Sequence, residues 1–165
     1  MHRQVIFDFN RNASLKDWET LNDVVVGGRS QGAITLSPEG YGWFVGTVSL
    51  ENNGGFSSVR FFLSGLEVDS QDKITIRLKG DGKRYQFRIK HDRQAYESYI
   101  THVETNGDWQ EITISLNELH PTFRGKKLDQ PNFNHHTIEQ LGFLIANKKA
   151  QDFELLIDNI ELISE

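Results

Sequence analysis

The sequence predicts an all-β domain, an antiparallel β-sandwich or jelly roll, from three observations. Apolar and polar residues alternate with a period of two along most of the chain. The 165 residues include 22 valines and isoleucines, nine threonines and 18 aromatic residues, but five alanines and one methionine, and this balance favours strands over helices. The apolar runs are short and end at turn residues, without the strand–helix–strand rhythm of a parallel sheet.

Ten alternating runs predict the strands. They are residues 5–9, 33–36, 43–50, 56–63, 74–78, 85–89, 98–103, 109–114, 141–145 and 153–163. We find no linker or repeat, so residues 1–165 are expected to form a single domain.

Turn residues predict how some of these runs connect. The turn at residues 38–42 joins two neighbouring runs as a pair. Gly80-Asp81-Gly82 predicts a hairpin between residues 74–78 and 85–89, because Asp-Gly supplies the positive φ of a tight turn.

Helical structure is expected to be slight. Ser14-Leu15-Lys16-Asp17 resembles a capping box and predicts one short helix. Residues 116–119 and 137–140 each predict a single helical turn, and residues 120–136 form the longest irregular stretch.

The charges are unevenly distributed. The net charge is −5, which argues against nucleic-acid binding. Residues 60–93 nevertheless hold nine Lys and Arg against five Asp and Glu. Alternation places Arg60, Arg84 and Arg88 opposite the core-facing residues, with Arg77 and Lys79 likewise outward, which predicts a basic, concave sheet face. Such a face binds an anionic partner, or it is a solvated face that keeps strand edges apart.

The most distinctive loop spans residues 23–32. Its Gly27, Gly28 and Gly32, beside Arg29 and Ser30, fit a backbone nest for an anion. A tight loop across the end of the sandwich explains the same residues. The loop lacks the Gly-Lys-Ser/Thr ending of a P-loop.

Other chemistry has weak support. There is no cysteine, which excludes disulfides, thiolate metal sites and cysteine nucleophiles. The six histidines lack metal-ligand spacing, and the serines lack a nucleophile elbow. Asp158 interrupts the last apolar strand, and together with Asp8 it gives weak support for a calcium site. The alternative that we favour is a strand-edge hydrogen bond or a salt bridge from Asp158 to Arg.

The aromatic residues are candidates for sugar binding. Five aromatic side chains stack on sugars if they are exposed on one face, although core packing is their usual role. They are Tyr41, Trp43, Tyr96, Tyr99 and Trp109.

The N-terminus alternates without a signal or transit pattern, and no apolar run is long enough for a transmembrane segment, so a cytoplasmic location is expected.

Several segments carry a family resemblance that covers nearly the whole chain in order. They are residues 23–32, 46–60, 80–87, 123–125, 141–148 and 153–160. In them the sequence resembles the complex I intermediate-associated proteins, the assembly factors of NADH:ubiquinone oxidoreductase, and their bacterial relatives. The resemblance implies a jelly roll of the galactose-binding-like type, similar to several carbohydrate-binding modules, and a bacterial single-domain member. Val26 stands where the family tends to have Met, and Asn147 where Asp is usual.

Three functions follow for testing. The first is a non-catalytic binding or assembly module that contacts a protein or anionic ligand. Its candidate residues are Asp23, Gly27, Gly28, Arg29, Ser30, Arg60, Arg84, Arg88 and Arg124, the last from the 123–125 segment. The second is a carbohydrate-binding module. The third and least supported is an enzyme with Asp23 as base and Arg29 as anion holder, so we expect no catalytic residues and no cofactor.

Overall fold

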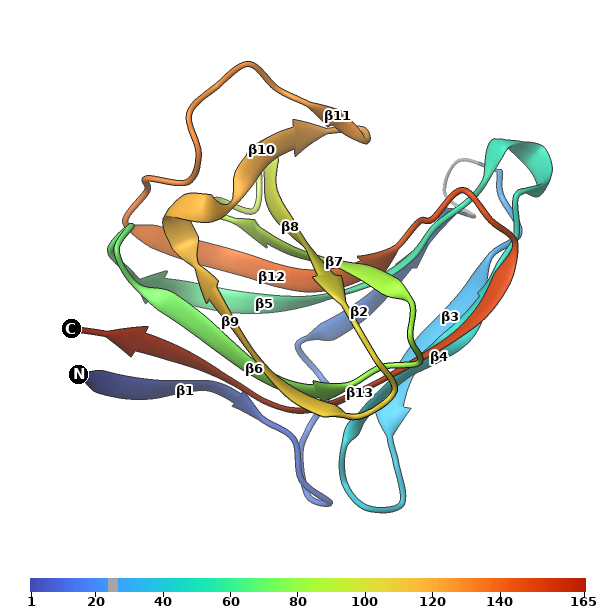
Figure 1. Cartoon of the computed structure of the whole chain (residues 1–165), viewed down its shortest axis with the longest axis horizontal. Helices are drawn as coiled ribbons and strands as arrows, with labels where there is room; N and C mark the ends of the chain where they lie inside the picture. Colours follow the sequence, from blue (N-terminus) through green and yellow to red (C-terminus); the bar gives the residue numbers. More distant parts are fainter. Residues whose placement is uncertain (24–26) are drawn as a thin grey trace.

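Two antiparallel sheets pack face to face in the computed structural model, which describes residues 1–23 and 27–165 (Figure 1). The predicted all-β sandwich is therefore confirmed, and the fold is a jelly roll. No helix among these residues has the length and apolar character needed to cross a membrane. Both termini lie at the same end of the molecule (Figure 1).

The six-stranded sheet is organised around its longest strand, β13 (Gln151–Ser164), which pairs with three others. On one side β13 pairs first with β4 and then with β1, and on the other side with β6. The remaining strands of this sheet are β1 (His2–Asp8), β3 (Gln31–Leu36), β4 (Gly42–Val48), β6 (Lys73–Lys79) and β9 (Trp109–Ser115).

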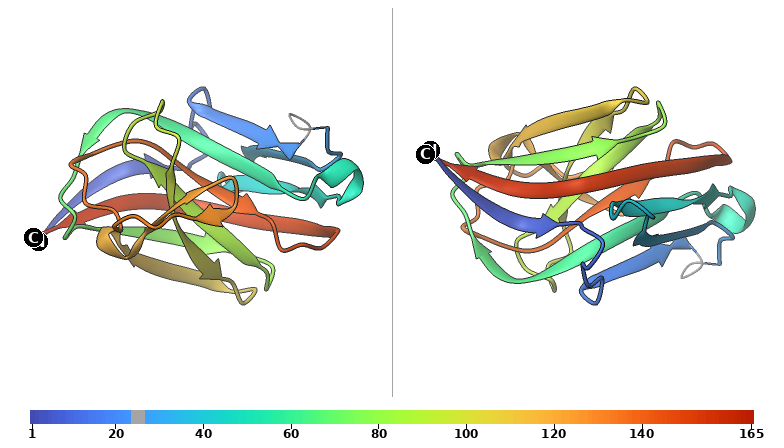
Figure 2. Two further views of the ribbon diagram at one scale, coloured as in Figure 1. Left: turned by 90° about the horizontal axis from the view of Figure 1, so that it is seen from above. Right: turned by 90° about the horizontal axis from the view of Figure 1, so that it is seen from below.

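The seven-stranded sheet runs in the order β11, β10, β8, β7, β12, β5, β2. It curves, so that β10 and β11 rise above its centre at one edge (Figure 1). Its strands are β2 (Trp18–Asn22), β5 (Ser57–Glu67), β7 (Arg84–Lys90), β8 (Ser98–Glu104), β10 (His120–Phe123), β11 (Lys126–Lys127) and β12 (Thr137–Ile145). Figure 2 shows the two layers from above and from below.

The core lies between the sheets, and the period-two pattern places it correctly. Ile74, Ile76 and Leu78 of β6 are fully buried, as are Tyr85, Phe87 and Ile89 of β7. An aromatic cluster closes one end, where the Phe61 ring stacks 4.9 Å from Trp18. At β1 a bulge between Val5 and Phe7 interrupts the alternation and leaves Val5 exposed.

The predicted hairpin between residues 74–78 and 85–89 is wrong. β6 pairs with β13 and β9, whereas β7 pairs with β12 and β8, so residues 80–83 cross from one sheet to the other. Asp81 makes this corner, because its carboxylate accepts hydrogen bonds from the Glu154 backbone N–H at 2.8 Å and from the Tyr85 hydroxyl at 3.0 Å. The pair predicted around residues 38–42 is confirmed as β3 and β4.

The predicted helices differ in outcome. Residues 14–17 form no helix; a turn closed by the Trp18 N–H and the Leu15 carbonyl leads directly into β2, because Trp18 packs into the core. The turn at residues 116–119 is confirmed as a short 3-10 helix, η3 (Leu116–Glu118), and a second, η2 (Glu51–Asn53), precedes β5. Residues 137–140 begin β12 instead, and the stretch expected to be irregular contains β10 and β11.

Candidate functional site

The outward face of the seven-stranded sheet carries the candidate site. One register row crosses five strands, from β5 through β12, β7 and β8 to β10. It consists of Arg60, Gly142, Arg88, Ile100 and His120. Since Gly142 has no side chain, Arg60 and Arg88 flank a strip of bare backbone. The predicted outward orientation of Arg60, Arg84 and Arg88 is thus confirmed by the register of their strands.

The cations on this face differ in their partners. Arg60 forms an ion pair with Glu19 at 2.6 Å, and Arg84 forms one with Glu104. Arg88 instead donates to the Gln86 side-chain carbonyl at 2.7 Å, and Lys90 to the Ala95 backbone carbonyl at 2.7 Å. Among the described residues, neither Arg88 nor Lys90 has a carboxylate in contact. Arg88 and Lys90 therefore place positive charge on this face without a directly paired carboxylate among the described residues.

Burial, and for three of the groups a neighbouring cation, lowers the pKa of four basic groups on this face. Burial lowers the pKa of Arg88, and burial together with Arg88 and Arg60 lowers the pKa of Lys90. The pKa of His102 is lowered by burial and by Arg84, and that of His120 by burial and by Lys127. An anion bound here would oppose each of these effects, because it favours the charged form of every group.

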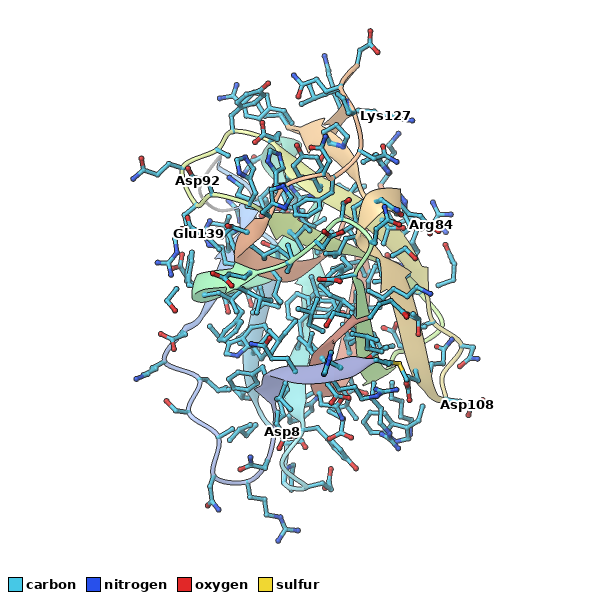
Figure 3. The ribbon with its side chains drawn as sticks, turned by 90° about the vertical axis from the view of Figure 1, so that its left-hand side faces the viewer. Asp8, Arg84, Asp92, Asp108, Lys127 and Glu139 are labelled. Carbon is cyan, nitrogen blue, oxygen red and sulfur yellow. The ribbon has the colours of Figure 1, made fainter. Side chains whose placement is uncertain are left out.

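A groove of about 420 Å³ opens where β7 and β8 of this face meet two loops. Its floor comes from β7 and β8, and its walls come from the β10–β11 turn and from the loop that joins β12 to β13. The lining residues are Arg84, Gln86, His102, Gly125, Ala146, Asn147 and Lys148. The Asn147 amide donates to the Arg84 backbone carbonyl and to the Gln151 side chain, both at 3.0 Å, which fixes the wall to the floor. In Figure 3, Arg84 and Lys127 lie on one side of the molecule, and Asp92 and Glu139 lie on the other.

The basic region is smaller than the sequence predicted. Arg77 and Lys79 face outward, but they belong to β6 in the six-stranded sheet, on the opposite side of the sandwich from Arg60, Arg84 and Arg88. The prediction of a single basic face from residues 60–93 is wrong in this respect. Sequence alternation fixes which side of a strand faces the core but not the sheet to which that strand belongs.

The 23–32 loop is built around a buried carboxylate. Asp23 is fully buried, and its carboxylate accepts hydrogen bonds from the Ser30 N–H at 2.8 Å and from the Ser30 hydroxyl at 2.5 Å. It also accepts from the N–H groups of Gly55 at 2.5 Å and Phe56 at 3.2 Å. Burial acts to raise the pKa of Asp23, but these hydrogen bonds outweigh burial and hold it below its usual value. Asp23 therefore serves as a structural tie, which removes the basis for its role as a base or a ligand contact.

Of the other predicted site residues, Gly27 and Gly28 shape the loop, whereas Arg29 and Arg124 are exposed. Gly28 packs against Asp23, where an added Cβ would lie 2.4 Å from the carboxyl carbon, and Gly27 has a φ of +93°. Arg29 is exposed, and neither Arg29 nor Ser30 lines the groove. Arg124 is exposed at the β10–β11 turn, beside Gly125 of the groove wall. The departure noted at Val26 lies outside the described residues.

The candidate calcium residues lie on two paired strands, Asp158 in β13 and Asp8 at the end of β1. The Asp158 carboxylate forms an ion pair with Arg77 at 3.4 Å, so the favoured salt bridge is confirmed. Asp8 stands opposite Asn159 in the β1–β13 register. Across residues 1–23 and 27–165, no three His, Asp or Glu side chains are arranged to hold a metal ion.

The five aromatic candidates do not all lie on one face. Trp43 and Trp109 lie on the outward side of the six-stranded sheet, where the Trp43 indole N–H donates to Glu154 at 2.8 Å and the Trp109 ring lies 4.7 Å from Tyr41. Tyr99 is buried, and Tyr96 is exposed near β10. Core packing thus describes Tyr99 alone.

Sequence reasoning missed the groove residues His102, Asn147 and Lys148. His102 carries a signal, since it alternates with the buried Val103, but its place beside Gln86 requires the β7–β8 pairing. Asn147 and Lys148 lie in a loop, where no periodicity indicates direction.

Comparisons with known proteins identify the fold. The chain is similar to the family 11 carbohydrate-binding module from Clostridium thermocellum in complex with a β-1,3-1,4-mixed-linked tetrasaccharide, with a TM-score of 0.72 and 18% identity over 98% of this chain and 95% of that one. The family 11 module of the Clostridium thermocellum cellulase Lic26A-Cel5E gives 0.72 and 17% identity over 99% and 95%. The agarase AgWH50C gives 0.64 and 15% identity over all of this chain and 25% of the enzyme. These likenesses show a carbohydrate-binding-module type of jelly roll.

Sequence comparison goes further than structure here. No functionally curated protein matches the chain in sequence. The family model for complex I intermediate-associated protein 30 matches residues 7–157, which is nearly the whole chain and includes both sheets and the groove. The chain belongs to the complex I intermediate-associated protein 30 (CIA30) family.

Proposed function

We propose that this chain is a non-catalytic binding module that holds an anionic group on the outward face of the seven-stranded sheet. The anionic group we favour is a carboxylate in an acidic segment of a protein partner. Family membership supports a protein partner, and the jelly roll supports a binding role.

The observation that carries this proposal is Arg88. Arg88 stands beside Gly142 in the β7–β12 register, and among the described residues the neutral Gln86 is the one side chain to which it donates a hydrogen bond. Burial makes the charge costly and lowers the pKa of Arg88. A guanidinium donates two parallel hydrogen bonds to a carboxylate or a phosphate, so an incoming anion satisfies donors that the protein leaves without a charged partner.

Calorimetry with a hexaglutamate peptide and with inorganic phosphate tests the proposal. At low salt, Arg88→Gln should weaken binding of the peptide at least about tenfold, the loss expected for a charged hydrogen bond. Lys79→Gln removes a charge from the opposite sheet and is the matched control, expected to leave affinity unchanged. Equal affinity in Arg88→Gln and the native chain, or no binding of either anion, would overturn the proposal.

A photo-cross-linking amino acid at His102 tests the protein partner in cells. His102 lines the groove, so the cross-linker should capture one partner, and competition with the hexaglutamate peptide should reduce the yield. The same group at Lys73, in the other sheet, is the control. Equal capture from both positions would contradict a partner at the groove.

Carbohydrate binding is a second candidate, favoured by the outward Trp43, Trp109 and Tyr41. The Glu154 carboxylate beside the Trp43 indole resembles the polar groups that orient a sugar on an aromatic ring. Retardation in gels containing mixed-linkage β-glucan tests this, with Trp43→Ala expected to abolish retardation. Arg88→Gln should leave it intact, because Arg88 lies on the opposite sheet.

A further inference from the structure

Two aromatic side chains are exposed beside the β10–β11 hairpin. Tyr96 is 54% exposed and Phe123 38% exposed. Their ring centroids lie 5.4 Å apart in an edge-to-face arrangement. The Gln130 amide donates to the Tyr96 hydroxyl at 2.9 Å, which holds the polar end of that ring. Large apolar rings that remain exposed at the surface in this way are typical of a site that contacts another molecule.

Three exposed cations belong to the same hairpin as Phe123. The Arg124 guanidinium lies 5.0 Å from the centroid of the Phe123 ring. Lys126 is the cross-strand partner of Phe123, and Lys127 is the partner of Thr122. The stretch from residue 119 to residue 128 contains no Asp or Glu; the next acid is Asp129. The exposed rings are therefore framed by positive charge.

The hairpin projects and has a fixed turn. β10 and β11 form the edge of the seven-stranded sheet and rise above its centre (Figure 1), and Lys127 lies at the end of the molecule remote from Asp8 and Asp108 (Figure 3). Arg124 and Gly125 have φ of +50° and +79°, the consecutive left-handed residues of a two-residue hairpin turn. A side chain such as that of Arg is uncommon in this conformation. The turn therefore presents Arg124 at the tip at some conformational cost.

We propose that Tyr96 and the β10–β11 hairpin dock on an anionic lipid surface. Aromatic rings lie at the level of lipid headgroups, and Lys and Arg beside them are attracted to anionic lipids. The rings sit on a projecting tip instead of in a recess, which suits a soft planar surface better than a rigid protein pocket. The whole chain carries −5, so an anionic surface repels most of the molecule and selects a hairpin-first approach.

The docking surface adjoins the groove, because Gly125 of the hairpin turn also lines the groove. Phe123 and Lys126 project on one side of the hairpin, while Thr122 and His120 belong to the face that carries Arg88. Arg88 belongs to β7 and lies outside the hairpin. Arg88→Gln should therefore weaken anion binding on the sheet face and leave lipid binding unchanged, so the two proposals can fail independently.

Cosedimentation with vesicles tests the proposal. The native chain should bind vesicles of equimolar POPC and POPG at about 50 mM salt, bind pure POPC vesicles weakly, and be released at about 500 mM salt. Each of Arg124→Asn, Lys126→Gln and Lys127→Gln should lower the partition coefficient about fivefold. Asn suits the left-handed turn, so Arg124→Asn keeps the hairpin. Lys73→Gln is the control for the charge substitutions. Leu50→Ser is the control for Phe123→Ser, because Leu50 is also an exposed apolar residue, at 45%, but lies outside the hairpin.

The absence of cysteine permits a second, direct readout. An NBD fluorophore attached to F123C should brighten and shift to the blue on POPC/POPG vesicles, whereas the same label on L50C should not. Equal responses at both positions, or equal binding to POPC and POPC/POPG, would overturn the proposal. Hairpin-dependent binding to polyglutamate without vesicle binding would overturn it too, because it would identify the hairpin as a docking site for an acidic protein.

Discussion

The carboxylate of Asp23 accepts hydrogen bonds from both the backbone N–H and the hydroxyl of Ser30, at 2.8 and 2.5 Å, seven positions further along the chain. The Ser30 hydroxyl in turn accepts from the Ser49 N–H at 2.9 Å. Because Gly55 and Phe56 also donate to Asp23, one buried carboxylate joins three segments: the 23–32 loop, the end of β4 and the start of β5.

We predict that Asp23→Asn lowers the free energy of unfolding by about 2–4 kcal/mol. The amide replaces one acceptor oxygen with a donor, which leaves buried N–H groups without an acceptor. Urea unfolding followed by tryptophan fluorescence measures the loss. Asp108→Asn, at an exposed turn, is the control and should lie within about 0.5 kcal/mol of the native chain. A loss in Asp23→Asn no larger than in this control would mean that the hydrogen bonds contribute little.

The Asp23 loop shows what sequence could and could not predict about the site. The residue types of an anion nest and of a carboxylate-tied loop are the same, namely small residues with free N–H groups. In a nest those N–H groups face an external anion, whereas here the anion is the side chain of Asp23. Burial decides between the two, and burial of a loop carboxylate leaves no periodic signal in the sequence.

Strand alternation predicted the outward direction of Arg60, Arg84 and Arg88 because one fully buried face requires it. The turn signal, in contrast, failed at Asp81, where an Asp-Gly pair makes a corner between sheets in place of a hairpin. The corner is favoured by the hydrogen bond that Asp81 accepts from the Glu154 N–H of β13, a residue more than 70 positions away in the sequence. The groove was unpredictable for the same reason, since four separate segments build it.

Histidine titration should make stability depend on pH. Burial and a neighbouring cation lower the pKa of His102 and His120, and burial with His91 lowers that of His135. Below about pH 6.5 the unfolded chain therefore binds more protons than the folded chain. The free energy of unfolding should fall as the pH drops from about 7.5 through 6.5 toward 5. Urea unfolding at a series of pH values measures this slope.

Variants assign this slope to the histidines. His102→Gln, His120→Gln and His135→Gln combined should flatten the pH dependence between about pH 7 and 5. His2→Gln, at the exposed start of β1, is the control and should retain the native slope. A slope that survives the triple replacement would show that other groups carry the pH dependence.

Close packing of β3 on β4 predicts a strict need for Gly46. A Cβ added to Gly46 would lie 2.0 Å from the Gln31 carbonyl oxygen and 2.5 Å from the Gly32 Cα, both backbone atoms. Gly46→Ala should therefore cost about 3 kcal/mol or more of unfolding free energy. Gly107→Ala is an informative contrast, because Gly107 has open space and a φ of +86°, and should cost about 1 kcal/mol through its dihedral alone. Equal losses in thermal unfolding would show that β3 can shift to accept the methyl group.

Tyr85 and Asp81 should contribute jointly to the corner between the sheets. The Tyr85 hydroxyl, in a side chain that is 1% exposed, donates to Asp81 at 3.0 Å and lies 3.2 Å from the Glu154 carbonyl. Tyr85→Phe should cost about 1–2 kcal/mol, and Asp81→Ala about 2–4 kcal/mol because the Glu154 N–H also loses its acceptor. In a double-mutant cycle measured by urea unfolding, the combined loss should be about 1 kcal/mol smaller than the sum of the two single losses.

The same pair predicts an effect at high pH. Burial, and then the nearby Asp81 carboxylate, raises the pKa of Tyr85. The unfolded chain then loses its phenolic proton first, so stability should be intact below about pH 10 and decline as the pH rises above it. Tyr85→Phe should reduce this alkaline decline. Strictly additive losses in the cycle, together with an unchanged alkaline decline, would show that the hydroxyl and the carboxylate act independently and that the corner depends on the Asp81–Glu154 bond alone.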